Sequence, residues 1–141
     1  FWDSSAIVPL LIDESTTIRL QSELAVDPHL SVWWATPVEC ASAVARRQHA
    51  GLISASEGAE ILAWLAALAP AWQVMEPVGA IRETAIRLLR THDLRAADAL
   101  QLAAAYAASE GRPPSLIFIS LDARLNAAAS REGFRLADLA T

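Results

Sequence analysis

Short apolar runs alternate along the chain with longer stretches in which apolar residues recur every three or four positions. The short runs predict strands, and the longer stretches predict helices. Strands are expected from the start of the chain through Trp2, at residues 31–35, 72–75 and 116–120, and weakly at 134–139. Helices are expected at residues 4–11, 16–25, 37–50, 56–68, 78–91, 96–109 and 123–132.

The order of these elements indicates the fold class. Strands separated by one or more helices imply a short central parallel sheet flanked by helices, which is an α/β architecture. The 141 residues contain no flexible linker, charge block or internal repeat, so we predict one domain spanning residues 1–141. Ligands in such folds bind beyond the carboxyl ends of the strands.

Three acidic residues lie near those strand ends. Asp3 follows the first strand, Asp122 follows the run at 116–120, and Glu39 comes four residues after the run at 31–35. A second interpretation is open for each residue alone. Asp3 and Asp122 precede helices and could be N-caps, while Thr36 to Glu39 has the spacing of a capping box with Pro37 at the first helical position.

Asp98 is different because it lies inside a predicted helix. Its neighbours on the same face are Leu94, Leu102 and Ala105, so a capping role does not easily explain it. An aspartate on such an apolar face loses hydration and needs a compensating partner. An ion pair with Arg46 or Arg95 is one possibility, and a metal ion is the other.

We expect the four carboxylates of Asp3, Glu39, Asp98 and Asp122 to converge. Four such groups do not stay ionised side by side without cations between them. Ligand sets made only of oxygen favour Mg²⁺ or Mn²⁺, which also accept phosphate oxygens. This combination is typical of phosphodiester hydrolysis by a metal-activated water, which leaves a 5′-phosphate and a 3′-hydroxyl.

Composition narrows the other possibilities. The single cysteine, Cys40, excludes an internal disulfide framework and multi-cysteine metal sites, favours a cytoplasmic location, and is expected to be a small core residue. All 11 basic residues are arginines, so Walker-type phosphate loops are excluded. A net charge of −5 argues against broad nucleic-acid affinity but not against a local arginine surface.

Several further functions are disfavoured. The longest uncharged stretch, residues 61–75, is shorter than the roughly 18 apolar residues of a membrane span, so no membrane association is expected. The histidines are expected at the surface, because no metal-binding spacing is present. A serine-hydrolase elbow is also absent. The histidines are His29, His49 and His92.

The motifs taken together resemble a known family. They are Asp3-Ser4-Ser5-Ala6 after a strand, Glu39 with Arg46 seven positions later, Arg95 to Ala99, and Ser120-Leu121-Asp122 followed by Gly133. In order and spacing they resemble the PIN domain, in particular the VapC toxins of bacterial toxin–antitoxin pairs. The resemblance covers essentially the whole chain.

The resemblance implies a Mg²⁺-dependent (or Mn²⁺-dependent) endoribonuclease that is the toxin of a type II toxin–antitoxin pair. It assigns Asp3, Glu39, Asp98 and Asp122 as the catalytic and metal-holding residues, with Ser5 and Ser120 in support. Ser120 stands where the family often has Thr, and Gln101 lies in a segment that often contains His. A homodimer and a cognate VapB-like antitoxin are the implied partners.

Arginines and tryptophans are candidates for binding RNA and the partner. Arg46, Arg95 and Arg124 each lie within a turn or two of a candidate ligand, although a solvated or ion-paired side chain is preferred for Arg124. Core positions are favoured for Trp33 and Trp34. For Trp64 a core role and an interface role are both open.

Two other functions compete with the nuclease. One is a catalytically silent PIN-like module that binds RNA or protein, although four retained acids argue against it. The other is a metal-dependent phosphatase acting on a small ester, which would turn over a generic aryl phosphate.

Overall fold

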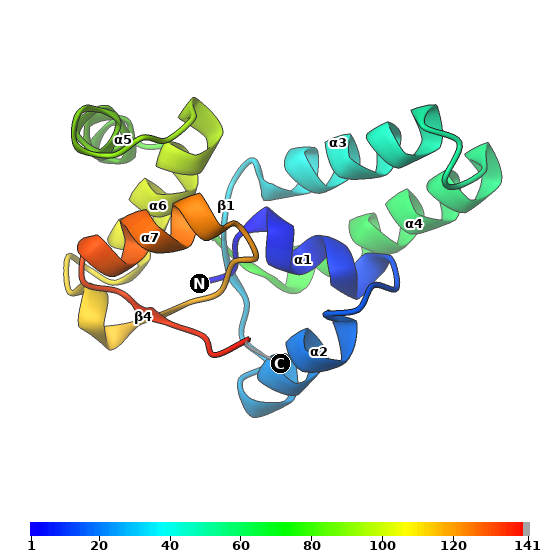
Figure 1. The fold of residues 1–141 in the computed structure, drawn as a ribbon, viewed down its shortest axis with the longest axis horizontal. Coiled ribbons are helices and arrows are strands. Elements are labelled where there is room, and N and C mark those ends of the chain that lie inside the picture. Colours follow the sequence, from blue (N-terminus) through cyan, green and yellow to red (C-terminus); the bar gives the residue numbers. More distant parts are fainter. Residues whose placement is uncertain (140–141) are drawn as a thin grey trace.

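The computed structural model describes residues 1–139, in which five short segments form parallel pairs (Figure 1). Strand β1 (Ser31–Trp33) pairs with β2 (Gln73–Met75), and β3 (Ile117–Phe118) pairs with β4 (Arg135–Leu136). The segment 1–3 joins the two pairs, since Trp2 forms a parallel bridge with Ile119 and donates its N–H to the Ser31 carbonyl. The resulting order is β2, β1, segment 1–3, β3, β4. The α/β class is thus confirmed.

The helices also follow the predicted pattern to within one or two residues at each end. Three of the described helices end shortly before glycines with positive φ, which are Gly51 and Gly111, both at 71°, and Gly133 at 93°. The helices are α1 (Ser4–Leu11), α2 (Thr17–Val26), α3 (Thr36–His49), α4 (Ala55–Leu68), α5 (Gly79–Thr91), α6 (Ala96–Ala108) and α7 (Ala123–Arg131). Short 3₁₀ turns occupy Ala69–Ala71 and Pro113–Ser115.

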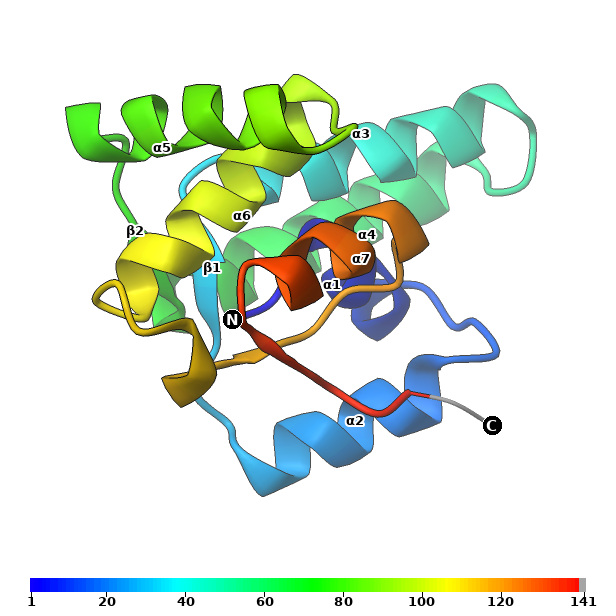
Figure 2. The same cartoon turned by 60° about the vertical axis from the view of Figure 1, so that its left-hand side comes forward.

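The central segments of the sheet, residues 1–3, β1 and residues 118–119, are largely buried because their side chains alternate between two hydrophobic clusters, whereas both residues of β4 are exposed. Phe1, Trp33 and Phe118 belong to the cluster covered by α5, α6 and α7. Their neighbours Trp2, Val32 and Ile119 belong to the cluster covered by α1 to α4. Figure 1 shows α5, α6 and α7 on one side of β1 and α1, α3 and α4 on the other, and Figure 2 shows α5 above α6, against which it packs.

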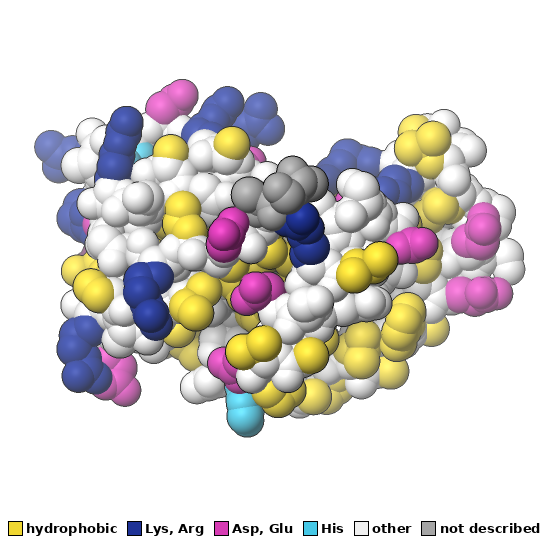
Figure 3. All heavy atoms as spheres, turned by 60° about the horizontal axis from the view of Figure 1, so that its bottom comes forward, with side chains coloured by type: hydrophobic (Ala, Val, Ile, Leu, Met, Phe, Trp, Pro, Cys, Tyr) yellow, Lys and Arg dark blue, Asp and Glu magenta, His cyan; other side chains and the backbone are white. Residues whose placement is uncertain are grey.

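The tryptophans differ in burial, and one of them differs from the prediction. Trp33 is 5% exposed, which confirms a core position, but Trp34 is 53% exposed, so the core position predicted for it is wrong. The reason is that β1 ends at Trp33 and Trp34 lies in the turn before α3. Trp64 is 54% exposed and lines an apolar cavity of about 400 Å³ beside α1 and α2. Figure 3 shows hydrophobic side chains gathered toward the lower right of the face that carries α2.

One histidine and the cysteine are also buried in the structure. His92, which was expected at the surface, has a side chain only 8% exposed, because it closes α5 and contacts Glu132 after α7. Cys40 is buried as predicted, and burial raises the pKa of its thiol to about 12. The thiol is therefore protonated at neutral pH. Among residues 1–139, no helix has both the length and the apolar character needed to cross a bilayer.

Candidate functional site

The four predicted acids all line one cavity of about 390 Å³. Each belongs to the start of a different helix: Asp3 and Asp122 are the N-caps of α1 and α7, and Glu39 and Asp98 lie in the first turns of α3 and α6. The cavity also lies where the strand order reverses, beside the carboxyl ends of segment 1–3 and β3, which is the usual ligand position in such sheets. Helix N-termini favour negative charge, so their convergence here helps the fold to tolerate clustered carboxylates.

Asp3 is held by a set of neutral donors. Its side chain is buried, and Oδ2 accepts hydrogen bonds from the Ser5 hydroxyl, the Ser5 N–H (3.1 Å) and the Ser120 hydroxyl (3.0 Å). The Ser5 hydroxyl also accepts from the N–H of Leu121, and the Ser120 hydroxyl accepts from the N–H of Asp122. The two serines therefore connect the ends of segment 1–3 and β3. Burial raises the pKa of Asp3, and the serine hydrogen bonds oppose that rise.

Glu39 faces the same cavity and does not cap its own helix. The capping box that the sequence left open as an alternative does not form, because α3 begins at Thr36 itself and makes no side-chain cap bond. Glu39 Oε2 instead accepts from the Ser4 hydroxyl (2.8 Å) and from Nε2 of Gln101 (3.2 Å). Burial raises the pKa of Glu39, and the nearby charges of Asp3 and Asp98 raise it further.

Asp98 is half-buried, and the structure corrects the expectation that capping does not explain it. Because α6 begins at Ala96, Asp98 is in the first turn, where backbone N–H groups lack helical partners. Its Oδ2 accepts from the backbone N–H of Arg95 at 3.2 Å. Within residues 1–139 no arginine side chain forms an ion pair with Asp98, so the predicted alternative of an arginine partner is not realised.

Asp122 caps α7 and also lies at the cavity. It is exposed, and Oδ1 accepts from the N–H of Leu125 at 2.8 Å, so the N-cap interpretation is confirmed for Asp122 as it is for Asp3. Both residues nevertheless line the cavity. The cap bonds of Asp98 and Asp122 each engage one carboxylate oxygen, Oδ2 and Oδ1 respectively.

Two of the three predicted arginines lie at the cavity. Arg46 and Arg95 line it, and Arg46 donates from Nη1 to the hydroxyl of Ser42 at 2.9 Å. Arg124 is exposed and is not among the lining residues. Within the described part of the chain, neither Arg46 nor Arg95 pairs with any of the four acids. Their cationic groups thus remain available to an anionic ligand.

The donor set fits a hard divalent cation in its chemistry. It consists of carboxylate oxygens with serine hydroxyls behind them, and two of the carboxyl groups have raised pKa values that a nearby cation would lower. As the side chains lie, no three acidic, histidine or cysteine side chains of residues 1–139 are grouped closely enough to form a metal centre. A shared ion therefore requires some of these side chains to rotate toward it.

Sequence reasoning missed two polar residues that contact the acids. Ser4, which directly follows Asp3, donates to Glu39, 35 positions away. Gln101 lies three positions after Asp98 and therefore on the same face of α6, so its helical spacing was a usable signal. No local signal connected either residue with Glu39.

Comparison with known proteins adds no assignment. No family model matches the chain, and no curated protein sequence matches it significantly.

Proposed function

We propose that the protein is a PIN-like, Mg²⁺- or Mn²⁺-dependent endoribonuclease and the toxin component of a type II toxin–antitoxin pair. The observation that carries the proposal is that four carboxylates from four helix starts line one cavity without an arginine partner among the described residues. Clustered acids that the protein itself does not neutralise are suited to an external cation.

The residues have distinct roles in this proposal. Asp3, Glu39, Asp98 and Asp122 would hold the cation. When bound, the cation lowers the pKa of a water molecule and neutralises charge that develops on the leaving oxygen. Ser5 and Ser120 orient Asp3, since their hydroxyls already donate to it.

Arg46 and Arg95 supply positive charge at the rim of an otherwise acidic cavity. A guanidinium group binds two phosphate oxygens at once, which suits an RNA backbone crossing the site. The resemblance adds a homodimer and a VapB-like antitoxin as partners of the same protein.

The silent module is the second candidate, and one observation favours it. The acidic side chains of residues 1–139 do not lie in a ready-made metal centre. A protein that binds RNA through Arg46 and Arg95 without cutting it would need no such centre.

Asp98→Asn separates these candidates, with Asp93→Asn as the matched control because Asp93 is exposed just before α6 and does not line the cavity. We expect the parent and the control to cleave single-stranded RNA with Mn²⁺ and to stop when a chelator is added. Asp98→Asn should lose about 100-fold or more of the rate at an unchanged melting temperature, because a ligand oxygen is replaced without a change of shape.

Three results would contradict the proposal. RNA binding without cleavage by the parent would favour the silent module. Turnover of an aryl phosphate without RNA cleavage would favour a phosphatase. A melting temperature of Asp98→Asn far below that of a parent that binds no Mn²⁺ would make Asp98 a structural residue.

A further inference from the structure

Gln101 is a buried amide of α6 that reaches across to α3 and contacts Glu39, one of the acids that line the cavity. The residue is 1% exposed, and Nε2 donates to Thr36 Oγ1 and to Glu39 Oε2, both at 3.2 Å. Its carbonyl oxygen Oε1 is buried and accepts no hydrogen bond. Both hydrogen bonds that the amide donates therefore go to residues of α3, while its acceptor Oε1 has no partner among the described residues.

This arrangement is unfavourable if the residue only fills space. A buried acceptor without a partner costs stability, and an apolar side chain of similar size would avoid that cost. The compensating contact is the one to Glu39, because a hydrogen bond to an ionised carboxylate is stronger than one between neutral groups. The reverse orientation of the amide would point Oε1 at the carboxylate and repel it.

We infer that Gln101 is a positioning residue that holds the Glu39 carboxylate in the orientation needed to bind a divalent cation, an inference that rests on the proposed function. Ser4 and Gln101 both reach Oε2, so the two donors fix the rotation of the carboxylate from opposite helices, α1 and α6. Outer hydrogen bonds of this kind orient metal ligands and raise metal affinity by about 10- to 100-fold.

The test is calorimetric titration of the whole protein with Mn²⁺, accompanied by thermal melts. Gln101→Leu removes the donors at nearly constant size, and we expect the dissociation constant for Mn²⁺ to rise about tenfold. Gln101→His restores a ring N–H and should recover most of the affinity. Gln101→Met, which also lacks the donors, replaces Gln101→Leu if the latter melts below the assay temperature.

Thr36→Val is the matched control. It breaks the other hydrogen bond of the same amide within the same buried layer, but it leaves the contact with Glu39 in place. We expect its Mn²⁺ affinity to equal that of the parent even if its melting temperature falls. If the role of Gln101 were purely structural, the Mn²⁺ affinities of Gln101→Leu and Thr36→Val would instead change together.

Cleavage assays separate positioning from direct ligation. Raising the Mn²⁺ concentration should restore most of the rate of Gln101→Leu but not the rate of Glu39→Gln. Unchanged Mn²⁺ affinity in Gln101→Leu, with normal binding by the parent, would overturn the role of Gln101 alone. A parent that binds no Mn²⁺ would overturn this inference together with the proposed function.

Discussion

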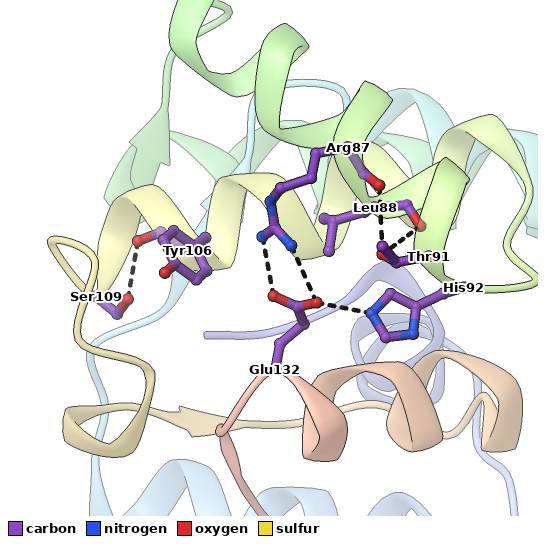
Figure 4. A network of polar contacts seen from close by, with 7 residues as sticks. All are labelled: Arg87, Leu88, Thr91, His92, Tyr106, Ser109 and Glu132. Carbon is purple, nitrogen blue, oxygen red and sulfur yellow. Dashed lines mark hydrogen bonds and ion pairs between the residues drawn. The ribbon is translucent and has the colours of Figure 1, made fainter.

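Two partly buried carboxylate sites in this protein are neutralised in opposite ways. Glu132, at the end of α7, receives two hydrogen bonds from the Arg87 guanidinium (2.9 and 3.2 Å), and its Oε1 lies 2.7 Å from Nε2 of His92 (Figure 4). Chiefly because Arg87 donates to it, the pKa of Glu132 is lowered. Among residues 1–139, the donors to Asp3 and Glu39 are hydroxyl, amide and backbone groups, and burial raises the pKa of both carboxyl groups.

At the first site an arginine of the chain pairs with the carboxylate, whereas at the second the described arginines pair with none of the carboxylates. At the junction of α5 and α7, Arg87 completes the charge balance and also lies 5.6 Å from the ring centre of Tyr106. At the cavity, Arg46 and Arg95 are present but pair with none of the acids among residues 1–139. The first arrangement is a structural ion pair, while the second is suited to an external cation.

The largest contrast is expected in RNA cleavage. Asp3→Asn should lower the rate by about 100-fold or more, because it removes a charged ligand while an Asn side chain still caps α1. Glu132→Gln should leave the rate within about twofold, since it lies outside the cavity. Initial rates on one RNA at saturating Mn²⁺ measure both variants. Equal losses in both would show that the junction and the cavity act as one unit.

For the free energy of unfolding, Glu132→Gln is expected to have a larger effect than Asp3→Asn. Glu132→Gln is expected to lower the free energy of unfolding by about 1–2 kcal/mol, a value that allows for the 46% exposure of the Arg87 side chain. Asp3→Asn should leave it unchanged or raise it, because a buried charge is removed. Urea unfolding in metal-free buffer provides the comparison. A stability loss in Asp3→Asn larger than that in Glu132→Gln would contradict it.

The smallest expected effect is a pH dependence of opposite sign at the two sites. Since the pKa of Asp3 is raised above its ordinary value of 3.8, ionisation costs stability as the pH rises through the folded-state pKa. The stability of Asp3→Asn relative to the parent should therefore rise as the pH increases. Since the pKa of Glu132 is lowered below 4.5, its contribution is complete above 4.5 and is lost as the pH falls through the folded-state pKa. The stability of Glu132→Gln relative to the parent should therefore fall as the pH increases.

Melting temperatures of the parent and both variants between about pH 3 and about pH 7, without metal, test these signs. Parallel curves for the two variants would show that neither carboxylate has the environment described for it.

Most of the fold was predictable because its signals are local. Helix α1 was expected at 4–11 and occurs at Ser4–Leu11, since a capping aspartate before it and apolar residues at helical spacing within it are recognisable within a few positions. The positions of Asp3 and Asp122 at strand ends followed from the element order. The environments of Trp34 and His92 were not predictable, since each depends on what packs against the residue.

The sequence alone determined the order of strands and helices and brought acids to the carboxyl ends of the strands, because periodicity and capping operate within one or two helical turns. Tertiary structure decided which carboxylates are neutralised. His92 meets Glu132 across 40 positions, and Gln101 meets Glu39 across 62. Contacts between residues so far apart in the sequence, and the burial that shifts the pKa values of these carboxyl groups, exist only once helices from distant parts of the chain pack together.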